Sequence, residues 1–278
     1  MGIPGTHPST PRPAVVERVI RRLVDSGPGV ERGDSLVVEE PLEIRLGDVP
    51  IAVVMRTPDD DVALAVGFLF SEGILRRPEQ VLSVEFCRDV AAEAEGNVVR
   101  VIAEGADLDA AENARRQIYA SSSCGICGKT TLDAVRLLAP PLAAPPALSF
   151  QQIVSLPGRL LAAQSLFAKT GGLHAAGLVR PDGTLELVRE DIGRHNACDK
   201  ILGTMAMRED WPLAGRAMII SGRASFEMVQ KAAMGGIACL IAVSAPSSLA
   251  VDYAREAGMT LLGFVREGSL NVYAGEIR

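Results

Sequence analysis

Aromatic residues are scarce in this chain: Phe, Trp and Tyr together make up 4% of its 278 residues. Charged residues (22%) and hydrophobic residues (48%) stand at the level of an ordinary globular protein. The apolar content therefore comes from small and aliphatic side chains, which favours close packing of helices on a sheet over an aromatic-rich β-sandwich. The length is sufficient for one large domain or two modest ones.

An excess of positive charge is also absent, because the formal net charge is −6. Nucleic acids are bound through basic surfaces, so we expect no nucleic-acid partner. Apolar stretches such as residues 62–70 are about nine residues long, whereas a bilayer span needs about 20, so we expect no membrane contact. The Pro-rich residues 1–13 contain no hydrophobic signal region and are expected to be a disordered lead-in. Together these absences predict a cytoplasmic protein.

We predict two folded regions and a connecting segment. An α+β domain over residues 14–115 is predicted from strands at 36–40, 42–46, 51–56, 81–88 and 97–102 and a helix that begins at Thr57-Pro58 and ends near residue 70. Residues 116–147 hold a loop with two cysteines, a helix at 129–138 and a stiff Pro-rich linker at 139–146. Residues 148–278 alternate between helices (150–167, 194–205, 225–234, 247–256) and strands (173–179, 185–188, 217–220, 238–243, 260–264). Such alternation predicts an α/β domain with a largely parallel sheet.

The five cysteines are an odd number in a chain without a signal peptide, so reduced thiols are expected rather than a disulfide framework. Cys124 and Cys127 form the one close pair, where the irregular Ser-Ser-Cys-Gly-Ile-Cys-Gly-Lys stretch enters a predicted helix. The N–H groups at a helix start and the nearby Lys129 stabilise a thiolate and lower the pKa of a thiol. The flanking glycines let the backbone flex. The leading interpretation is a mobile nucleophilic or persulfide-bearing pair.

Other interpretations of the pair stay open. A thioredoxin-like redox motif would be expected early in a βαβ unit and with an aromatic residue before it. A structural zinc site needs four ligands, which His174, His195 and Cys198 would have to complete. A zinc nucleobase deaminase combines His-x-Glu with Cys-x-x-Cys, but no glutamate follows His174 at that spacing and the cysteines precede it. Plain packing is disfavoured because the surrounding serines and glycines do not resemble a core.

Polar loops follow several predicted strands of the second domain. Ligands of open α/β sheets bind beyond the carboxyl ends of the strands. Small residues let backbone N–H groups approach an anion, and Arg side chains grip phosphates with two hydrogen bonds. Each loop alone can be a helix cap, but their convergence at one sheet edge predicts a phosphate-containing ligand. The candidate residues are Ser221, Gly222, Arg223, Arg194 and His195.

Four motifs in this order resemble one known family. They are Ser-Ser-Cys-Gly-Ile-Cys-Gly-Lys with Cys124, Gly-Gly-Leu-His-Ala-Ala with His174, Glu-Asp-Ile-Gly-Arg-His-Asn-Ala-Cys-Asp-Lys with Arg194, and Ser-Gly-Arg-Ala-Ser-Phe-Glu-Met-Val-Gln-Lys with Arg223. Over about residues 35–275 the chain is similar to FdhD, the family of sulfurtransferase accessory proteins of formate dehydrogenase. At Cys198 the family more often has an aliphatic residue, which argues against a chemical role for this thiol.

The resemblance implies a mechanism. A cysteine desulfurase would load a persulfide onto Cys124, with Cys127 as its helper, and the sulfur would pass to the molybdenum (or tungsten) cofactor in its bis-molybdopterin guanine dinucleotide form. GDP would be a partial mimic of that cofactor, and formate dehydrogenase would receive it. The stretch that matches the family's cofactor-binding segment is Phe264, Val265, Arg266, Glu267, Gly268 and Ser269.

The resemblance also implies a fold and an assembly. It predicts a mixed sheet with flanking helices, like that of the cytidine deaminases but without their zinc, plus a smaller N-terminal α+β domain. It further implies a homodimer and no resident metal. A non-catalytic chaperone that binds the cofactor and hands it on is the alternative function.

Overall fold

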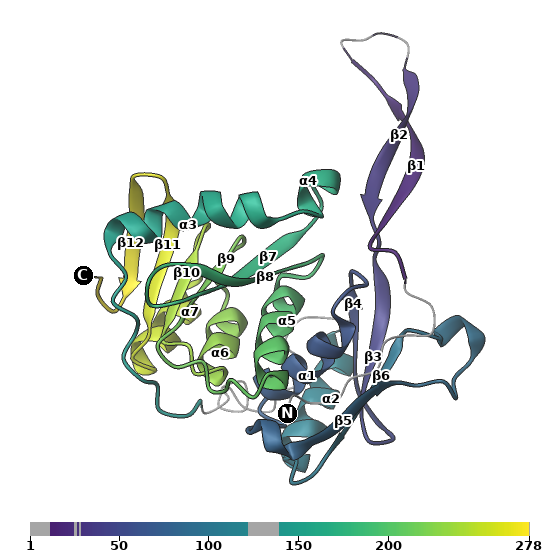
Figure 1. Cartoon of the computed structure of the whole chain (residues 1–278), viewed down its shortest axis with the longest axis horizontal. Helices are drawn as coiled ribbons and strands as arrows, with labels where there is room; N and C mark the ends of the chain where they lie inside the picture. The colour runs from purple at the N-terminus through teal and green to yellow at the C-terminus, as the bar shows by residue number, and fades with distance from the viewer. Residues whose placement is uncertain (1–11, 25–26, 28, 122–138, 278) are drawn as a thin grey trace.

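The computed structural model describes residues 12–24, 27, 29–121 and 139–277, and the strands within these ranges form three separate sheets (Figure 1). One sheet has the order β4-β3-β6-β5, with the strands β3 (Glu40–Leu46), β4 (Val49–Arg56), β5 (Val81–Phe86) and β6 (Val98–Ala103). The short helices η1 (Pro78–Gln80) and η2 (Ala92–Ala94) flank β5. The helices α1 (Asp61–Ser71) and α2 (Leu108–Ser121) share one hydrophobic core with this sheet.

The second sheet has the order β12-β11-β10-β9-β7-β8. Its strands are β7 (His174–Val179), β8 (Leu185–Asp191), β9 (Ala217–Ile220), β10 (Cys239–Ala242), β11 (Thr260–Arg266) and β12 (Ser269–Ala274). Only β9, β10 and β11 run parallel, so the expectation of a largely parallel sheet is wrong. The reason is that short turns join β7 to β8 and β11 to β12, and such turns force antiparallel pairing. The mixed α/β class is confirmed, and the likeness to cytidine deaminases stays a prediction.

Helices cover both faces of this six-stranded sheet. On one face lies α3 (Phe150–Ala163), and on the other lie α5 (Arg194–Met207), α6 (Phe226–Met234) and α7 (Ser248–Glu256). In β9, Ala217 and Ile219 pack toward α3, whereas Met218 and Ile220 pack toward α5 and α6. This alternation follows from the two-residue period of a strand, and burial on both faces explains the continuous apolar runs of β9 and β10.

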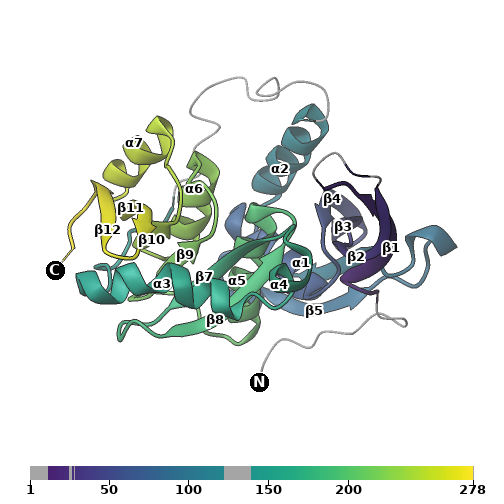
Figure 2. The same ribbon diagram turned by 90° about the horizontal axis from the view of Figure 1, so that it is seen from above.

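We call the four-stranded sheet with α1 and α2 the N-terminal lobe, and the six-stranded sheet with its helices the C-terminal lobe. The two lobes meet where α1 packs against α5 (Figure 2). Two glycines make this contact unusually close. A Cβ on Gly67 would lie 1.8 Å from the carbonyl oxygen of Asp199, and a Cβ on Gly203 would lie 1.8 Å from that of Ala63. Only glycine therefore allows the two helix backbones to touch at these positions.

Several local expectations need correction. Helix α1 begins at Asp61 and not at Pro58, because Thr57 is buried and its Oγ1 accepts a hydrogen bond from the N–H of Ile192 instead of capping the helix. The helix expected at 150–167 ends at Ala163, and a separate short helix α4 (Phe167–Thr170) follows. Helix α2 runs from the expected N-terminal domain into the expected connecting segment, and the division into domains stays a prediction. Most of the expected lead-in and the helix expected at 129–138 lie outside the described residues.

The third sheet is a hairpin that the sequence did not predict. Its strands, β1 (Val15–Arg22) and β2 (Val30–Val37), pair over eight residues and project away from the rest of the molecule (Figure 1). The helix α4 lies beside the base of β2. Among the described residues, no helix is long and apolar enough to cross a membrane.

Candidate functional site

The loop after β9 lies against the start of β7 and the start of α5. Ser221 extends the β9–β7 pairing: its N–H donates to the carbonyl of Ala175 (3.0 Å), and its Oγ accepts from the N–H of Ala175 (2.9 Å). A Cβ on Gly222 would lie 3.4 Å from His174 Nδ1 and 3.8 Å from Arg194 Cδ. The structure thus brings Ser221, Gly222, His174 and Arg194 together from three separate motifs.

His195 at the start of α5 contacts Glu227 at the start of α6, with 2.9 Å between His195 Nε2 and Glu227 Oε2, and the two form an ion pair when the imidazole is protonated. The hydrogen bond from His195 lowers the pKa of Glu227, against the effect of partial burial. Glu227 belongs to a motif that carries the family resemblance, but its role was not predicted. The sequence did place an acidic residue in the first turn of a predicted helix. Such a residue is usually explained by its favourable interaction with the helix dipole, so it did not indicate a partner for His195.

His174 carries an imidazole that favours the neutral form. Its pKa lies below the ordinary value, first because the ring is partly buried and then because Arg194 and His195 place positive charge beside it. Asp191 opposes this effect. A neutral ring between cationic groups offers one N–H donor and one nitrogen acceptor to a ligand.

Polar groups without partners concentrate near the same loops. Within the described part of the chain, the Nε of Arg194 and the Oγ of Ser225 are buried atoms without a hydrogen-bond partner. Ser225 occupies the N-cap position of α6 but does not cap it. Arg223 is exposed. Buried polar atoms usually have partners, so these unsatisfied donors, with the first N–H groups of α6, match a polar or anionic ligand.

The loops after β9, β10 and β11 converge at one sheet edge, as expected. Ala224 donates its N–H to the carbonyl of Ala245 (3.2 Å), and Phe264 donates its N–H to the carbonyl of Ser244 (3.2 Å). The loop after β10 therefore links the Arg223 loop to the end of β11. That a ligand binds there stays a prediction.

The stretch from Phe264 to Ser269 is a bulged hairpin rather than an open loop. Phe264 has φ 51°, and the register of β11 against β12 shifts between Gly263 and Arg266. The guanidinium of Arg266 lies 5.8 Å from the centre of the Phe264 ring. Val265 is buried in the core, while Glu267, Gly268 and Ser269 are exposed at the turn. Side chains available to a ligand are thus those of Phe264, Arg266, Glu267 and Ser269.

The Asp191 carboxylate fixes the turn that precedes α5. It accepts hydrogen bonds from the N–H of Thr57 (3.2 Å), the N–H of Gly193 (2.8 Å) and the amide of Asn196 (2.8 Å), and it pairs with Lys200 (2.8 Å). Asp191 and Lys200 are fully buried. Asp191 and Lys200 of the family motif at residues 190–200 therefore anchor the turn to the N-terminal lobe. Arg194 of the same motif faces the loops described above.

The second anchor between the lobes is the buried Lys231. Its ammonium donates to Ser71 Oγ (2.7 Å) and pairs with Asp199 Oδ2 (3.0 Å) and Glu72 Oε1 (3.1 Å). Burial alone would lower the pKa of Lys231, but the carboxylates of Asp199 and Glu72 raise it instead. Lys231 is consequently charged and unavailable to a ligand.

Three of the five cysteines are buried: Cys87, Cys198 and Cys239. The Sγ of Cys198 lies 3.4 Å from the Sδ of Met218 in the core, and burial followed by the charge of Asp199 raises the pKa of this thiol. Burial raises the pKa of Cys239 to about 12. Cys124 and Cys127 lie outside the described residues.

The zinc alternative gains no support from the described ranges, which contain no group of three His, Cys, Asp or Glu residues suited to a metal ion. The core position of Cys198 removes it as a partner for His174 and His195. Absence of zinc from the whole chain stays a prediction, because the cysteine pair is not among those residues.

Comparison with known proteins agrees with the sequence motifs. The family model for the FdhD/NarQ family matches residues 37–278. A protein named sulfur carrier protein FdhD from Streptomyces avermitilis is 48% identical over 94% of this chain and 94% of its own length, and one of the same name from Mycobacterium tuberculosis is 45% identical over 94% and 96%. The crystal structure of a candidate formate dehydrogenase accessory protein from Desulfotalea psychrophila matches with a TM-score of 0.72 and 25% identity, over 95% of this chain and 98% of that one. On these matches, the chain belongs to the FdhD/NarQ family.

Proposed function

We propose that this chain is a sulfur carrier that holds sulfur as a persulfide on Cys124 and transfers it to the molybdenum cofactor of formate dehydrogenase. The observation that supports this most directly is the burial of Cys87, Cys198 and Cys239. A carrier needs an accessible thiolate, and the buried thiols of Cys198 and Cys239 have raised pKa values. Cys124 and Cys127 are left as the candidates for the carrier thiol. A sulfur-carrier role agrees with the name of the relatives, sulfur carrier protein FdhD.

Loading and delivery are both thiol exchange reactions. In loading, the Cys124 thiolate attacks the outer sulfur of a persulfide on a cysteine desulfurase, and the desulfurase thiolate leaves. In delivery, the Cys127 thiolate attacks the inner sulfur of the Cys124 persulfide, a Cys124–Cys127 disulfide forms, and hydrosulfide is released to the cofactor. A cellular dithiol then reduces the disulfide. Cys127 thus assists delivery rather than loading.

The C-terminal lobe supplies a place for the cofactor as substrate. We assign the phosphates of its guanine dinucleotide to the Arg223 loop, Arg194, His195 and the start of α6, where unsatisfied donors lie. Because the chain is acidic, affinity for a polyanion must come from such local contacts. The half-buried ring of Phe264 and the turn 266–269 extend this surface along the same sheet edge.

Binding of GDP tests the cofactor surface. Arg223→Ala should weaken GDP binding, measured by calorimetry, by about 1.5–3 kcal/mol, the scale of a hydrogen bond to a charged group. Arg208→Ala is the matched control, because Arg208 is exposed at the opposite end of α5 from Arg194. Unchanged affinity in Arg223→Ala would remove Arg223 from the site. Equal affinity for ADP and GDP would contradict the guanine preference.

Transfer assays test the carrier role. Cys124→Ala should abolish loading by a cysteine desulfurase, Cys127→Ala should slow delivery more than loading, and Cys239→Ala, which alters a buried thiol, should do neither. Equal losses at both steps in Cys127→Ala would contradict the division of roles. If Cys124→Ala still supports formate dehydrogenase fully, the chain acts as a cofactor chaperone. A cytoplasmic location is part of the same proposal.

A further inference from the structure

Glu227 is an unexpected residue at a site for phosphates. It stands in the first turn of α6, where we place the phosphates of the cofactor, and a carboxylate repels a bound phosphate. The hydrogen bond from His195 lowers the pKa of Glu227, so the carboxylate is charged. A negative group at this position needs a role that outweighs its repulsion of the ligand.

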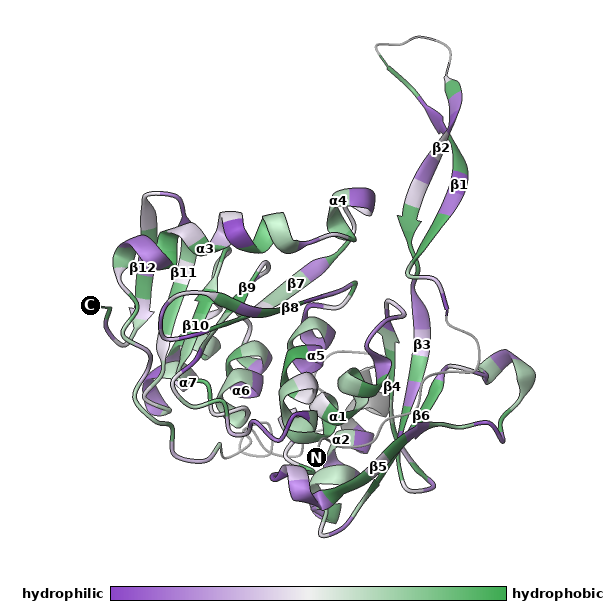
Figure 3. Ribbon diagram, in the orientation of Figure 1, coloured by the Kyte–Doolittle hydropathy of each residue, from purple (hydrophilic) through white to green (hydrophobic). Residues whose placement is uncertain are grey.

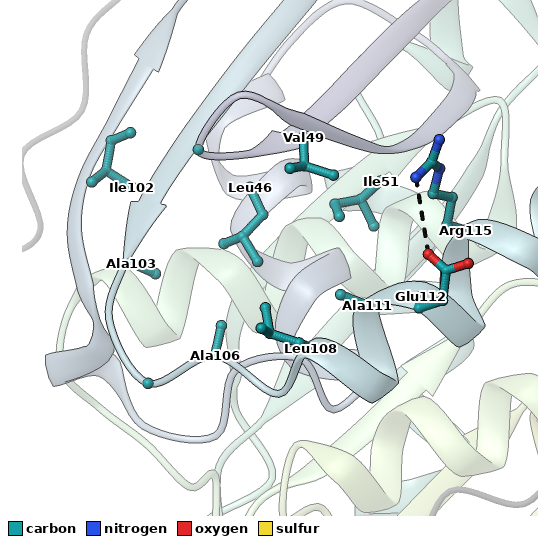
Figure 4. Close-up of a pocket in the computed structure, with 12 residues that line it drawn as sticks. Leu46, Val49, Ile51, Ile102, Ala103, Ala106, Leu108, Ala111, Glu112 and Arg115 are labelled. Carbon is teal, nitrogen blue, oxygen red and sulfur yellow. Dashed lines mark ion pairs between the residues drawn. The ribbon is translucent and has the colours of Figure 1, made fainter.

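A cavity in the N-terminal lobe is not suited to the phosphates instead. It encloses about 420 Å³ between the β3–β4 turn, the end of β6 and the start of α2 (Figure 4). Its walls are mainly apolar, and its Arg115 is paired with Glu112 at 3.9 Å. A diphosphate needs donors with surplus positive charge. Such donors lie at the polar start of α5, which is purple in Figure 3, and in the loops beside it.

The contact with Glu227 fixes the position of one proton on His195. The Nε2 atom of His195 is shielded from solvent and lies 2.9 Å from Glu227 Oε2. A bare ring nitrogen at this distance would place its lone pair against those of a carboxylate oxygen, so Nε2 must carry a hydrogen. The His195 side chain is 31% exposed, and Nδ1 is the ring nitrogen left for a ligand.

A phosphate can accept a hydrogen bond from Nδ1 only if the ring carries two protons. In a neutral imidazole, one nitrogen is a donor and the other is an acceptor. With its hydrogen on Nε2, a neutral His195 would present a lone pair to the phosphate oxygen. A second proton turns Nδ1 into a donor and makes the hydrogen bond to the phosphate charge-assisted. The carboxylate of Glu227 stabilises this doubly protonated ring.

The other charges nearby do not replace Glu227 in this role. The charged and titratable groups around the pair come from four elements: Arg194 of α5, His174 of β7, Asp191 of β8, and Glu227 and Lys231 of α6. Asp191 and Lys231 each form a buried pair with a group of opposite charge, so their fields largely cancel. Arg194 opposes a second proton on either histidine, and His174 accordingly favours its neutral form. His195, beside its carboxylate, is the histidine suited to hold the charge.

We propose that Glu227 is a positioning residue for the cofactor: it holds His195 in the doubly protonated form, so that Nδ1 donates to a phosphate of the guanine dinucleotide. The inference rests on the proposed function, because it concerns the surface to which that function assigns the phosphates. Glu227 acts through His195 and does not itself touch the ligand. Binding then draws a proton from the solvent, and the affinity for a diphosphate should fall as the pH rises.

Calorimetry with GDP tests this role through the sign of one effect. If Glu227 only stabilises the start of α6, removal of its charge beside a bound anion should leave binding unchanged or strengthen it. We expect the opposite: Glu227→Gln should raise the Kd for GDP about 10-fold, because the charge-assisted hydrogen bond from His195 is lost. Asp182→Asn is the matched control. It removes the same charge from an exposed turn beyond the far end of β7, and it should leave the Kd unchanged.

Two further measurements separate positioning from a structural role. In a His195→Gln background, Glu227→Gln should no longer weaken binding, because no imidazole is left to position. Calorimetry at a pH of about 8, in buffers of different ionisation enthalpy, counts the protons taken up with GDP. The intact chain should take up more protons than His195→Gln or Glu227→Gln, and the titration of GDP itself is common to all three proteins.

The results distinguish failure of this role from failure of the proposed function. An intact chain that does not bind GDP would refute the cofactor surface, and the role of Glu227 with it. GDP binding that Arg223→Ala weakens, but that Glu227→Gln leaves unchanged or strengthens, would keep the surface and overturn the role of Glu227. Equal proton uptake by the intact chain and both variants would overturn that role as well.

Discussion

Replacement of Lys231 by methionine should strongly destabilise the protein. The Lys231 ammonium lies within 3.1 Å of Ser71, Asp199 and Glu72, at the junction of α6 with α1 and α5. Lys231→Met keeps the volume but leaves the Asp199 carboxylate, which is 1% exposed, without its cation. Loss of one partner of a buried pair costs about 3–5 kcal/mol, and we expect a loss of this size in the free energy of unfolding.

Urea denaturation followed by circular dichroism measures the effect. Three features identify the buried pair as its cause. The double variant Lys231→Met/Asp199→Leu should be more stable than Lys231→Met alone, since no uncompensated charge remains. The deficit of Lys231→Met should shrink as the pH falls, because a buried carboxylate without its cation has a raised pKa and takes up a proton in the folded state. Lys169→Met, at an exposed lysine, should change stability by less than about 0.5 kcal/mol. A loss below about 1 kcal/mol in Lys231→Met would refute the reasoning.

Three further outcomes follow from the same structure. Gly67→Ala should lower the free energy of unfolding in urea by more than about 2 kcal/mol, because the added Cβ would overlap the backbone of a neighbouring helix. Gly158→Ala, whose Cβ would meet nothing within 4 Å, should stabilise α3 slightly. Equal effects of the two substitutions would contradict the close helix contact. NMR titration should give His174 a pKa below 6.5, and an unshifted value would contradict the cationic environment. Because the folded state disfavours the protonated ring, the wild-type protein should lose stability as the pH falls through that region, and His174→Gln should abolish this loss. Purified protein should hold no stoichiometric zinc by mass spectrometry, and zinc lost together with stability on Cys127→Ala would overturn the carrier assignment.

Much of the C-terminal lobe could be predicted from its sequence. Short apolar runs such as residues 217–220 end in Ser, Gly and Arg, and the structure confirms a buried strand followed by a polar loop. The pattern carries this information because both faces of the strand are covered, so every position is apolar. Strand direction was harder to predict, since it depends on the two tight turns that create hairpins at the sheet edges.

The β1–β2 hairpin was missed for a related physical reason. Strand β1 reads Val-Val-Glu-Arg-Val-Ile-Arg-Arg, and neither of its faces is buried in the chain, so no two-residue alternation marks it. Roles within the site were also only partly predictable. Asp191, Asp199 and Lys200 stand in one motif with Arg194 and His195, but the first three anchor the lobes to each other. Residue types alone do not reveal which side of a helix meets a neighbouring lobe.

The central claim is that Cys124 carries the sulfur, and intact-mass analysis after incubation with a cysteine desulfurase and cysteine tests it most directly. We expect the chain to gain the mass of one sulfur atom, removable by a thiol reductant, and we expect Cys124→Ala to gain none while Cys239→Ala gains it normally. A sulfur adduct on Cys124→Ala that forms at the normal rate would contradict the account.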